Sequence, residues 1–145
     1  WLELEITESV LLEDIEVAIR NLTELRDIGI SISMDDFGTG FSSLSYIHQL
    51  PINTLKIDRS FVSRIDRHKI SEKMVESISL LATNLELILV AEGIETLEQA
   101  NKLLDLGCHV MQGFYFSKPI EGTGPVYHYI ETVKAEHKDS QWPRF

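Results

Sequence analysis

The sequence predicts an α/β fold with a parallel sheet, because short apolar runs alternate with longer segments of helical spacing. Strands that follow one another through helical crossovers pair in parallel. Several runs, such as residues 87–91, are apolar almost throughout, which is typical of strands covered on both faces. An open doubly wound sheet and a closed barrel both fit this pattern. Five strands are predicted, at residues 2–7, 30–34, 54–57, 87–91 and 110–114.

Helix signals fill the segments between these strands. Apolar residues from Val17 to Ile28 recur at a largely helical spacing, and Gly29 is a typical residue just past a helix end. Thr96, followed three residues later by Gln99, forms a capping-box pattern that predicts a helix after the fourth strand. Three further helices are predicted, around Leu44 and Ile47, over residues 71–83 and over residues 126–133.

Composition and charge limit the classes of protein. The 145 residues fit one domain, and 43% hydrophobic with 25% charged residues is typical of a packed, globular protein. The net charge of −10 argues against general affinity for polymeric nucleic acid or anionic membranes, which requires clustered Lys and Arg. The longest apolar stretch, residues 85–94, is far shorter than the roughly 20 residues that span a bilayer. The lone Cys108 cannot form an internal disulfide and is interpreted as a buried thiol.

Charged and amide side chains gather where the predicted strands end. In parallel α/β folds the carboxyl ends of the strands meet at one edge, where active sites lie. Acids placed this close together repel one another unless a cation or a proton compensates them. A divalent metal site is therefore predicted here. The strand-end residues are Glu5, Glu8, Asp35, Asp36, Lys56, Asp58, Glu92, Glu95 and Gln112.

Each of these residues alone also has an ordinary structural explanation. Glu5 fits a solvated edge strand, and the Asp pair before Gly38 fits a turn. Lys56 fits a surface lysine paired with Asp58, and Glu92 fits an acid that complements a helix dipole. Gln112 fits an amide that satisfies backbone groups. Their coincidence at equivalent strand ends favours a site. The five histidines show no metal-type pairing, and the serines lie in no nucleophile elbow.

Five segments carry a resemblance to a known family: LELEITES, MDDFGTGFSSL, LKIDRSF, VAEGIET and MQGFYFSKP. In order and spacing they resemble the EAL family of cyclic di-GMP phosphodiesterases, over residues 2–121. The resemblance implies a modified (β/α)8 TIM barrel, of which this chain supplies the C-terminal portion with about five βα units. It also implies hydrolysis of cyclic di-GMP to linear pGpG in bacterial second-messenger signalling.

The resemblance implies a two-metal site for Mg²⁺ or Mn²⁺. Glu5 and Asp35 resemble ligands of the first ion, and Asp35 would bridge to a second ion held by Asp36 and Glu92. Lys56 resembles the lysine that orients the attacking water. Two metals can offset the anionic charge that makes a phosphodiester a poor electrophile. Glu92 could equally accept the proton of that water, and the sequence does not separate base from ligand.

The remaining strand-end residues resemble supporting parts of the family site. Gln112 resembles a residue near the attacking water. Glu8 resembles the acid that anchors the DDFGTG loop, which in the family couples metal binding to dimer contacts. Asp58 and Glu95 are expected in supporting roles.

The resemblance divides the chain into a partial EAL domain, residues 1–121, and a C-terminal helix with a polar tail, residues 122–145. The chain begins at Trp1 and shows no signal segment. It is therefore expected to be a piece of a longer protein and to be a cytoplasmic domain. The family's Glu-Ala-Leu motif and an Asn ligand are absent from the sequence, so the isolated chain is expected to be inactive. A homodimer and an upstream sensor or diguanylate cyclase domain are the implied partners, and membrane anchoring of the parent is left open.

Two other functions remain as alternatives. A non-catalytic EAL domain would act as a cyclic di-GMP receptor or a protein-interaction module. An α/β metal enzyme of the enolase type would also place acids and a lysine at strand ends, but it does not explain the DDFGTG loop.

Overall fold

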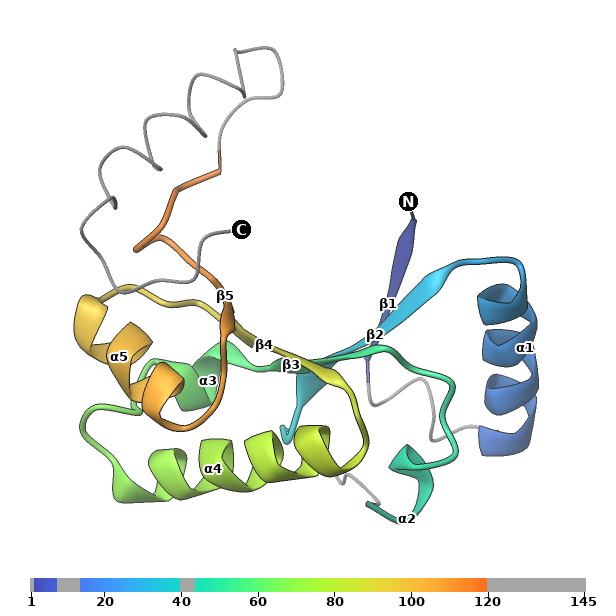
Figure 1. The fold of residues 1–145 in the computed structure, drawn as a ribbon, viewed down its shortest axis with the longest axis horizontal. Coiled ribbons are helices and arrows are strands. Elements are labelled where there is room, and N and C mark those ends of the chain that lie inside the picture. Colours follow the sequence, from blue (N-terminus) through green and yellow to red (C-terminus); the bar gives the residue numbers. More distant parts are fainter. Residues whose placement is uncertain (1, 8–13, 40–43, 120–145) are drawn as a thin grey trace.

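The computed structural model of the protein describes residues 2–7, 14–39 and 44–119. They form one five-stranded sheet in the order β1-β2-β3-β4-β5, with all neighbouring strands parallel (Figure 1). The predicted α/β class and parallel pairing are confirmed. The elements are β1 (Glu3–Thr7), α1 (Ile15–Asp27), β2 (Ser31–Phe37), α2 (Leu44–Ile47), β3 (Thr54–Ile57), α3 (Arg59–Val62), α4 (Lys69–Asn84), β4 (Ile88–Glu92), α5 (Leu97–Asp105) and β5 (Val110–Gln112).

Two strand ends differ from the sequence predictions by two residues or more. β2 continues through both aspartates to Phe37, because its last residues still pair with β1 and β3. β5 ends at Gln112, because the chain turns back at Gly113, whose carbonyl accepts a bond from the Phe116 amide. The one-turn helix α3 was not predicted. The helix predicted at residues 126–133 lies outside the described residues.

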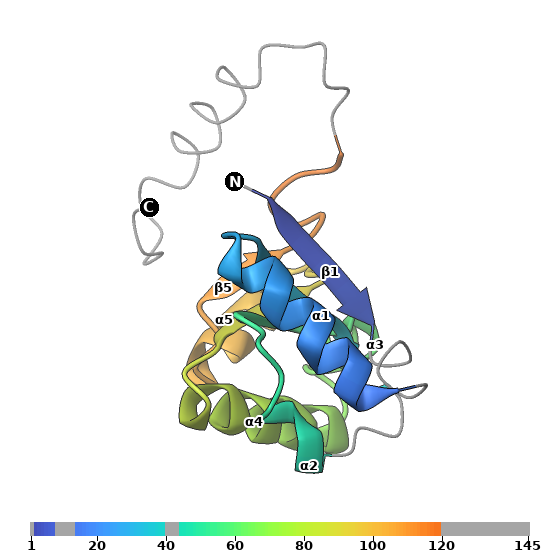
Figure 2. The ribbon, with the colours of Figure 1, turned by 90° about the vertical axis from the view of Figure 1, so that its right-hand side faces the viewer.

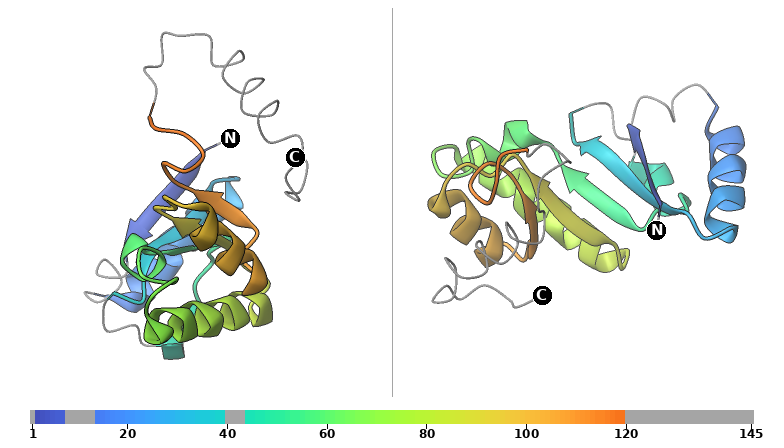
Figure 3. Two further views of the ribbon diagram at one scale, coloured as in Figure 1. Left: turned by 90° about the vertical axis from the view of Figure 1, so that its left-hand side faces the viewer. Right: turned by 90° about the horizontal axis from the view of Figure 1, so that it is seen from above.

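One face of the sheet, here named the covered face, packs against the helices. Residues paired across parallel strands point to the same side, so the register assigns Ile32, Leu55 and Leu89 to this face. All three are buried in one apolar cluster with Leu22 of α1 and Leu103 of α5. Figure 1 shows α4 and α5 on the same side of the sheet, and Figures 2 and 3 show α1 beside β1 and β2 at the far end. Removing this apolar area from water is the main stabilising contribution to the fold.

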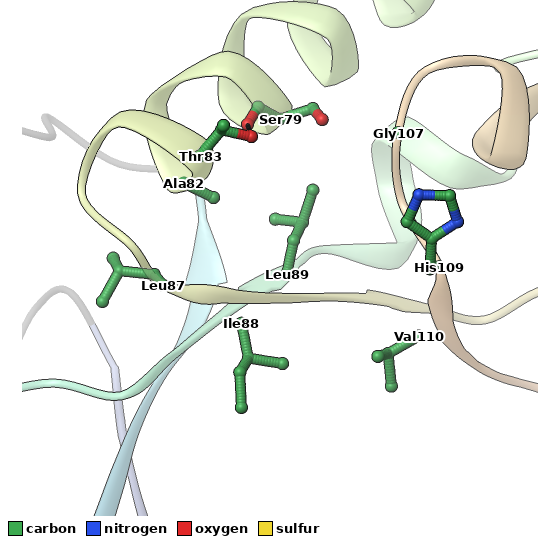
Figure 4. Close-up of a pocket in the computed structure, with 9 residues that line it drawn as sticks. All are labelled: Ser79, Ala82, Thr83, Leu87, Ile88, Leu89, Gly107, His109 and Val110. Atoms are coloured by element: carbon green, nitrogen blue, oxygen red, sulfur yellow. Dashed lines mark hydrogen bonds between the residues drawn. The ribbon is translucent and has the colours of Figure 1, made fainter. Parts of the chain in front are cut away.

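The other side of the strands, here named the open face, carries no helix among the residues that the structure describes. Its residues Ile88 and Val110 are 55% and 39% exposed. Figure 4 shows both side chains pointing away from α4, on the opposite side of β4 from Leu89. The apolar pattern of the strands predicted that both faces of the sheet are covered. Within the described ranges, helices cover only one of the two faces. In these ranges, no helix combines the length and apolar character needed to cross a bilayer.

Candidate functional site

The open face brings four of the predicted site residues together around Lys56, near the carboxyl end of the central strand β3. The Lys56 Nζ atom lies 2.7 Å from Glu5 Oε1 of β1 and 2.6 Å from Glu92 Oε1 of β4. It also lies 3.6 Å from Asp35 Oδ1 of β2. Side chains from four strands thus converge on one point, here named the Lys56 cluster. In the register, Glu5 is level with Ser33, two residues before Asp35, and Lys56 is level with Val90, two residues before Glu92. All four side chains are therefore on the same face of the sheet.

Burial and charge set the protonation state of Lys56. Its side chain is only 10% exposed. Burial by itself lowers the pKa of the ammonium group, but the carboxylates of Glu5, Glu92 and Asp35 outweigh this effect and raise the pKa above the ordinary 10.5. Lys56 is therefore a cation at every physiological pH and donates hydrogen bonds. It cannot serve as a general base, which has to be unprotonated.

A β-bulge in β2 explains why two consecutive aspartates avoid the covered face. Met34 pairs with Leu55 and Phe37 pairs with Ile57, so β2 carries one residue more than β3 between these pairs. Met34 and Phe37 are both buried on the covered face. Asp36 takes up the extra length in the left-handed region, with a φ of 55°.

Asp36 forms a second acidic group beside the Lys56 cluster. Burial, together with the charges of Asp35 and of the neighbouring Asp58, raises the pKa of its carboxyl group. The Asp35 carboxylate accepts a 2.9 Å bond from the Asp36 amide. Asp58 caps α3 by accepting a 3.0 Å bond from the Ser60 amide. The crowding of three carboxyl groups favours binding of a proton or a cation.

The other predicted residues lie around these two groups. Gln112 ends β5 and pairs in register with Glu92, so it is on the open face next to the Lys56 cluster. Glu95 is outside the cluster and forms an ion pair with Arg59. Glu8 lies outside the described residues. Sequence reasoning missed Arg59, although its place three residues after Lys56 at a strand end was a usable signal.

The chemistry of the carboxylates suits a hard divalent cation. Carboxylate oxygens are ligands that Mg²⁺ and Mn²⁺ prefer, and three carboxylates facing one ammonium group leave the Lys56 cluster net negative. No group of three or more His, Cys, Asp and Glu side chains in the described ranges is arranged to hold a metal. The point on which Glu5, Asp35 and Glu92 converge is taken by the Lys56 ammonium group.

A cavity of about 220 Å³ lies elsewhere, at the amino end of β4 and β5 (Figure 4). Ser79 and Thr83 of α4 line it together with Leu89 and His109. Because Ile88 at the start of β4 also borders it, the cavity is at the opposite end of the strand from Glu92. It therefore has no part in the Lys56 cluster.

Comparison with known proteins identifies the family. Residues 1–119 match the family described as the EAL domain. The chain belongs to the EAL domain family. The cyclic di-GMP phosphodiesterase NbdA of Pseudomonas aeruginosa is 43% identical over 120 residues, which are 83% of this chain and 15% of NbdA. This EAL chain thus spans a small part of that relative's length.

Solved structures show the same fold. The PaMucR phosphodiesterase, determined as a c-di-GMP complex, matches with a TM-score of 0.80 and 41% identity, over 83% of this chain and 49% of that one. BlrP1 of Klebsiella pneumoniae, determined as a manganese/cy-diGMP complex, matches with a TM-score of 0.75 and 32% identity, over 81% and 30% of the two chains. EAL domains are TIM-barrel-like, and the predicted fold class is confirmed.

Proposed function

We propose that the complete protein containing this EAL chain hydrolyses cyclic di-GMP to linear pGpG with the aid of Mg²⁺ or Mn²⁺. The observation that carries the proposal is the convergence of Glu5, Asp35 and Glu92 on Lys56 at the carboxyl end of the sheet. The phosphodiesterase NbdA and the cyclic di-GMP complex of PaMucR support the substrate. The manganese complex of BlrP1 supports the choice of metal.

In this proposal the acids of the open face hold two metal ions. Glu5 and Asp35 would bind the first ion, and Asp35, Asp36 and Glu92 would bind the second. When bound, the ions supply Lewis-acid chemistry that offsets the charge of the phosphodiester. The raised pKa of Asp36 supports a cation here, because a cation would relieve the repulsion among the neighbouring carboxylates.

The protein's own groups would orient the water and the substrate. The Lys56 ammonium group would donate a hydrogen bond to the attacking water or to a phosphate oxygen and act as an orienting group. Glu92, 2.6 Å from Lys56, is the carboxylate placed to take the proton of that water if it is not held as a metal ligand. Gln112 lies beside Glu92 in the register and would position the same water.

The test is hydrolysis of cyclic di-GMP by the complete protein, with the product identified by chromatography. We expect linear pGpG to form with Mg²⁺ or Mn²⁺ and to disappear when EDTA removes the metal. Glu92→Gln should abolish the reaction, whereas Arg64→Ala, an exposed arginine of the α3–α4 connection, should leave it unchanged. Tight binding of cyclic di-GMP without turnover would favour the non-catalytic receptor instead.

Two further properties belong to the same proposal. The isolated 145-residue chain is expected to hydrolyse cyclic di-GMP weakly or not at all, because the Glu-Ala-Leu motif and the Asn ligand of the family are absent from its sequence. Adding metal and substrate to the purified chain measures this directly. The complete protein is expected to be a homodimer that carries a sensor or diguanylate cyclase domain, which light scattering and the sequence of the complete gene test.

A further inference from the structure

We propose that Arg59 is a positioning residue that holds residues 92–95, the segment that follows β4 and begins with Glu92. The inference rests on the proposed function for the role of Glu92. It concerns a residue outside the Lys56 cluster, on the neighbouring helix α3. Arg59 acts on the segment in two ways, through its aliphatic stem and through its guanidinium group.

The stem of Arg59 lies directly over Gly93. A Cβ atom added to Gly93 would be 2.3 Å from Arg59 Cγ and 2.7 Å from Arg59 Cδ, much closer than atoms can approach. The φ of Gly93 is +71°, a conformation that side chains also disfavour. Glycine therefore lets the arginine stem rest against the backbone immediately after Glu92.

The guanidinium group of Arg59 forms an ion pair with Glu95. This ion pair parallels the one between Lys56 and Glu92. Arg59 follows Lys56 by three residues, and Glu95 follows Glu92 by three residues. Two ion pairs thus join the end of β3 and the start of α3 to residues 92–95. The inner pair contains the 10% exposed Lys56, whereas Arg59 and Glu95 are 60% and 46% exposed.

Hydrogen bonds fix the segment on its other side. The Ile94 amide donates to the Gln112 carbonyl at 3.2 Å, and the Tyr115 amide donates to the Ile94 carbonyl at 2.9 Å. The Glu95 amide donates to Gln99 Oε1 of α5 at 2.8 Å. Arg59 supplies the contact from the side of α3, so it completes the enclosure of the segment that bears Glu92.

The exposure of the outer pair separates positioning from stability. Exposed ion pairs contribute little to the free energy of unfolding. Loss of Arg59 should therefore leave the melting temperature nearly unchanged while residues 92–95 become more mobile. A small displacement of a reacting group is enough to slow a reaction strongly.

The experiment compares Arg59→Ala, Arg59→Met and Arg64→Ala in the complete protein. Hydrogen–deuterium exchange is followed in peptides that cover residues 92–96, and kcat and KM are measured for cyclic di-GMP. We expect Arg59→Ala to speed exchange in these peptides and to lower kcat about 10-fold, with KM changed less than about threefold. Arg59→Met keeps an apolar stem over Gly93 and should lie between Arg59→Ala and the wild type. Arg64→Ala should match the wild type.

Unchanged exchange and unchanged kcat in Arg59→Ala would overturn the inference. A raised KM with unchanged kcat would also overturn it, because Arg59 would then contact the substrate. If Arg59→Ala fails to fold, Glu95→Gln breaks the ion pair from the other side and should show the same faster exchange. A wild-type protein without hydrolytic activity would refute the proposed function alone, since the exchange measurements still decide whether Arg59 holds the segment.

Discussion

The two faces of the sheet are built from alternating residues of the same five strands, yet they differ in what fills them. On the covered face, Ile32, Leu55 and Ala91 are fully buried beneath the helices. On the open face, the same strands place Lys56 among acids at their carboxyl ends. The two-residue period of the strands thus separates stability from chemistry, because alternate residues of each strand face the core and the candidate site. Substitutions on the covered face should therefore lower the free energy of unfolding, and substitutions at the site on the open face should lower catalytic activity.

The largest effect is expected from Lys56→Met on the open face. The change keeps much of the side-chain volume but removes the only cation among the three carboxylates of the Lys56 cluster. We expect kcat for cyclic di-GMP to fall by about 10²–10⁴-fold, the range for a group that assists proton transfer or orients water. Steady-state kinetics of the complete protein measure this. Circular dichroism should show an intact fold. A wild-type kcat in the Lys56→Met protein would show that Lys56 has no role in the reaction.

The next largest effect is expected from Leu55→Ala on the covered face. Leu55 is fully buried, and its truncation should lower the free energy of unfolding by about 2–5 kcal/mol. The matched change on the open face is Ile88→Ala on the neighbouring strand, where the side chain is 55% exposed and the loss should be smaller. Urea unfolding of both variants of the complete protein measures the difference. Equal losses would show that another segment of the protein covers the open face.

A pH-dependent effect is expected from the buried Cys108. Burial raises the pKa of its thiol to about 11, whereas the ordinary value is 9.0. The unfolded chain therefore releases the proton first, and the stabilisation present below pH 9 is progressively lost as the pH rises towards 11. The loss should reach about 1 kcal/mol at pH 10. Urea unfolding at pH 8 and pH 10 should show this extra loss in the wild type and not in Cys108→Ala.

The smallest effect is expected from Thr96→Ala at the start of α5. The Thr96 hydroxyl accepts a 3.2 Å bond from the Gln99 amide, and the Gln99 side chain accepts one from the Thr96 amide. Loss of the cap should cost about 1 kcal/mol in the free energy of unfolding. Thr83→Ala is the control, because the Thr83 hydroxyl bonds the Ser79 carbonyl within α4 and caps nothing. Indistinguishable losses in the two variants would argue against a capping contribution.

Much of the fold and part of the candidate site could be predicted from the sequence. The strand at Thr54–Ile57 was predicted with its observed bounds. The turn signals on both sides leave only four residues for it, so its ends could hardly be placed elsewhere. The capping box of Thr96 and Gln99 was predicted and is confirmed, since it depends on residues only three apart. The helix α3 was missed because its single turn is too short to show a periodic pattern.

The sequence by itself determined the alternation of elements and the placement of acids and a lysine at strand ends, because these follow from local periodicity. Only the tertiary structure decided which of them meet. The ion pair of Lys56 with Glu5 joins residues 51 positions apart, and that of Arg59 with Glu95 joins residues 36 apart. The bulge before Phe37 turns Asp36 towards Asp58, a consequence of strand register that no local pattern contains.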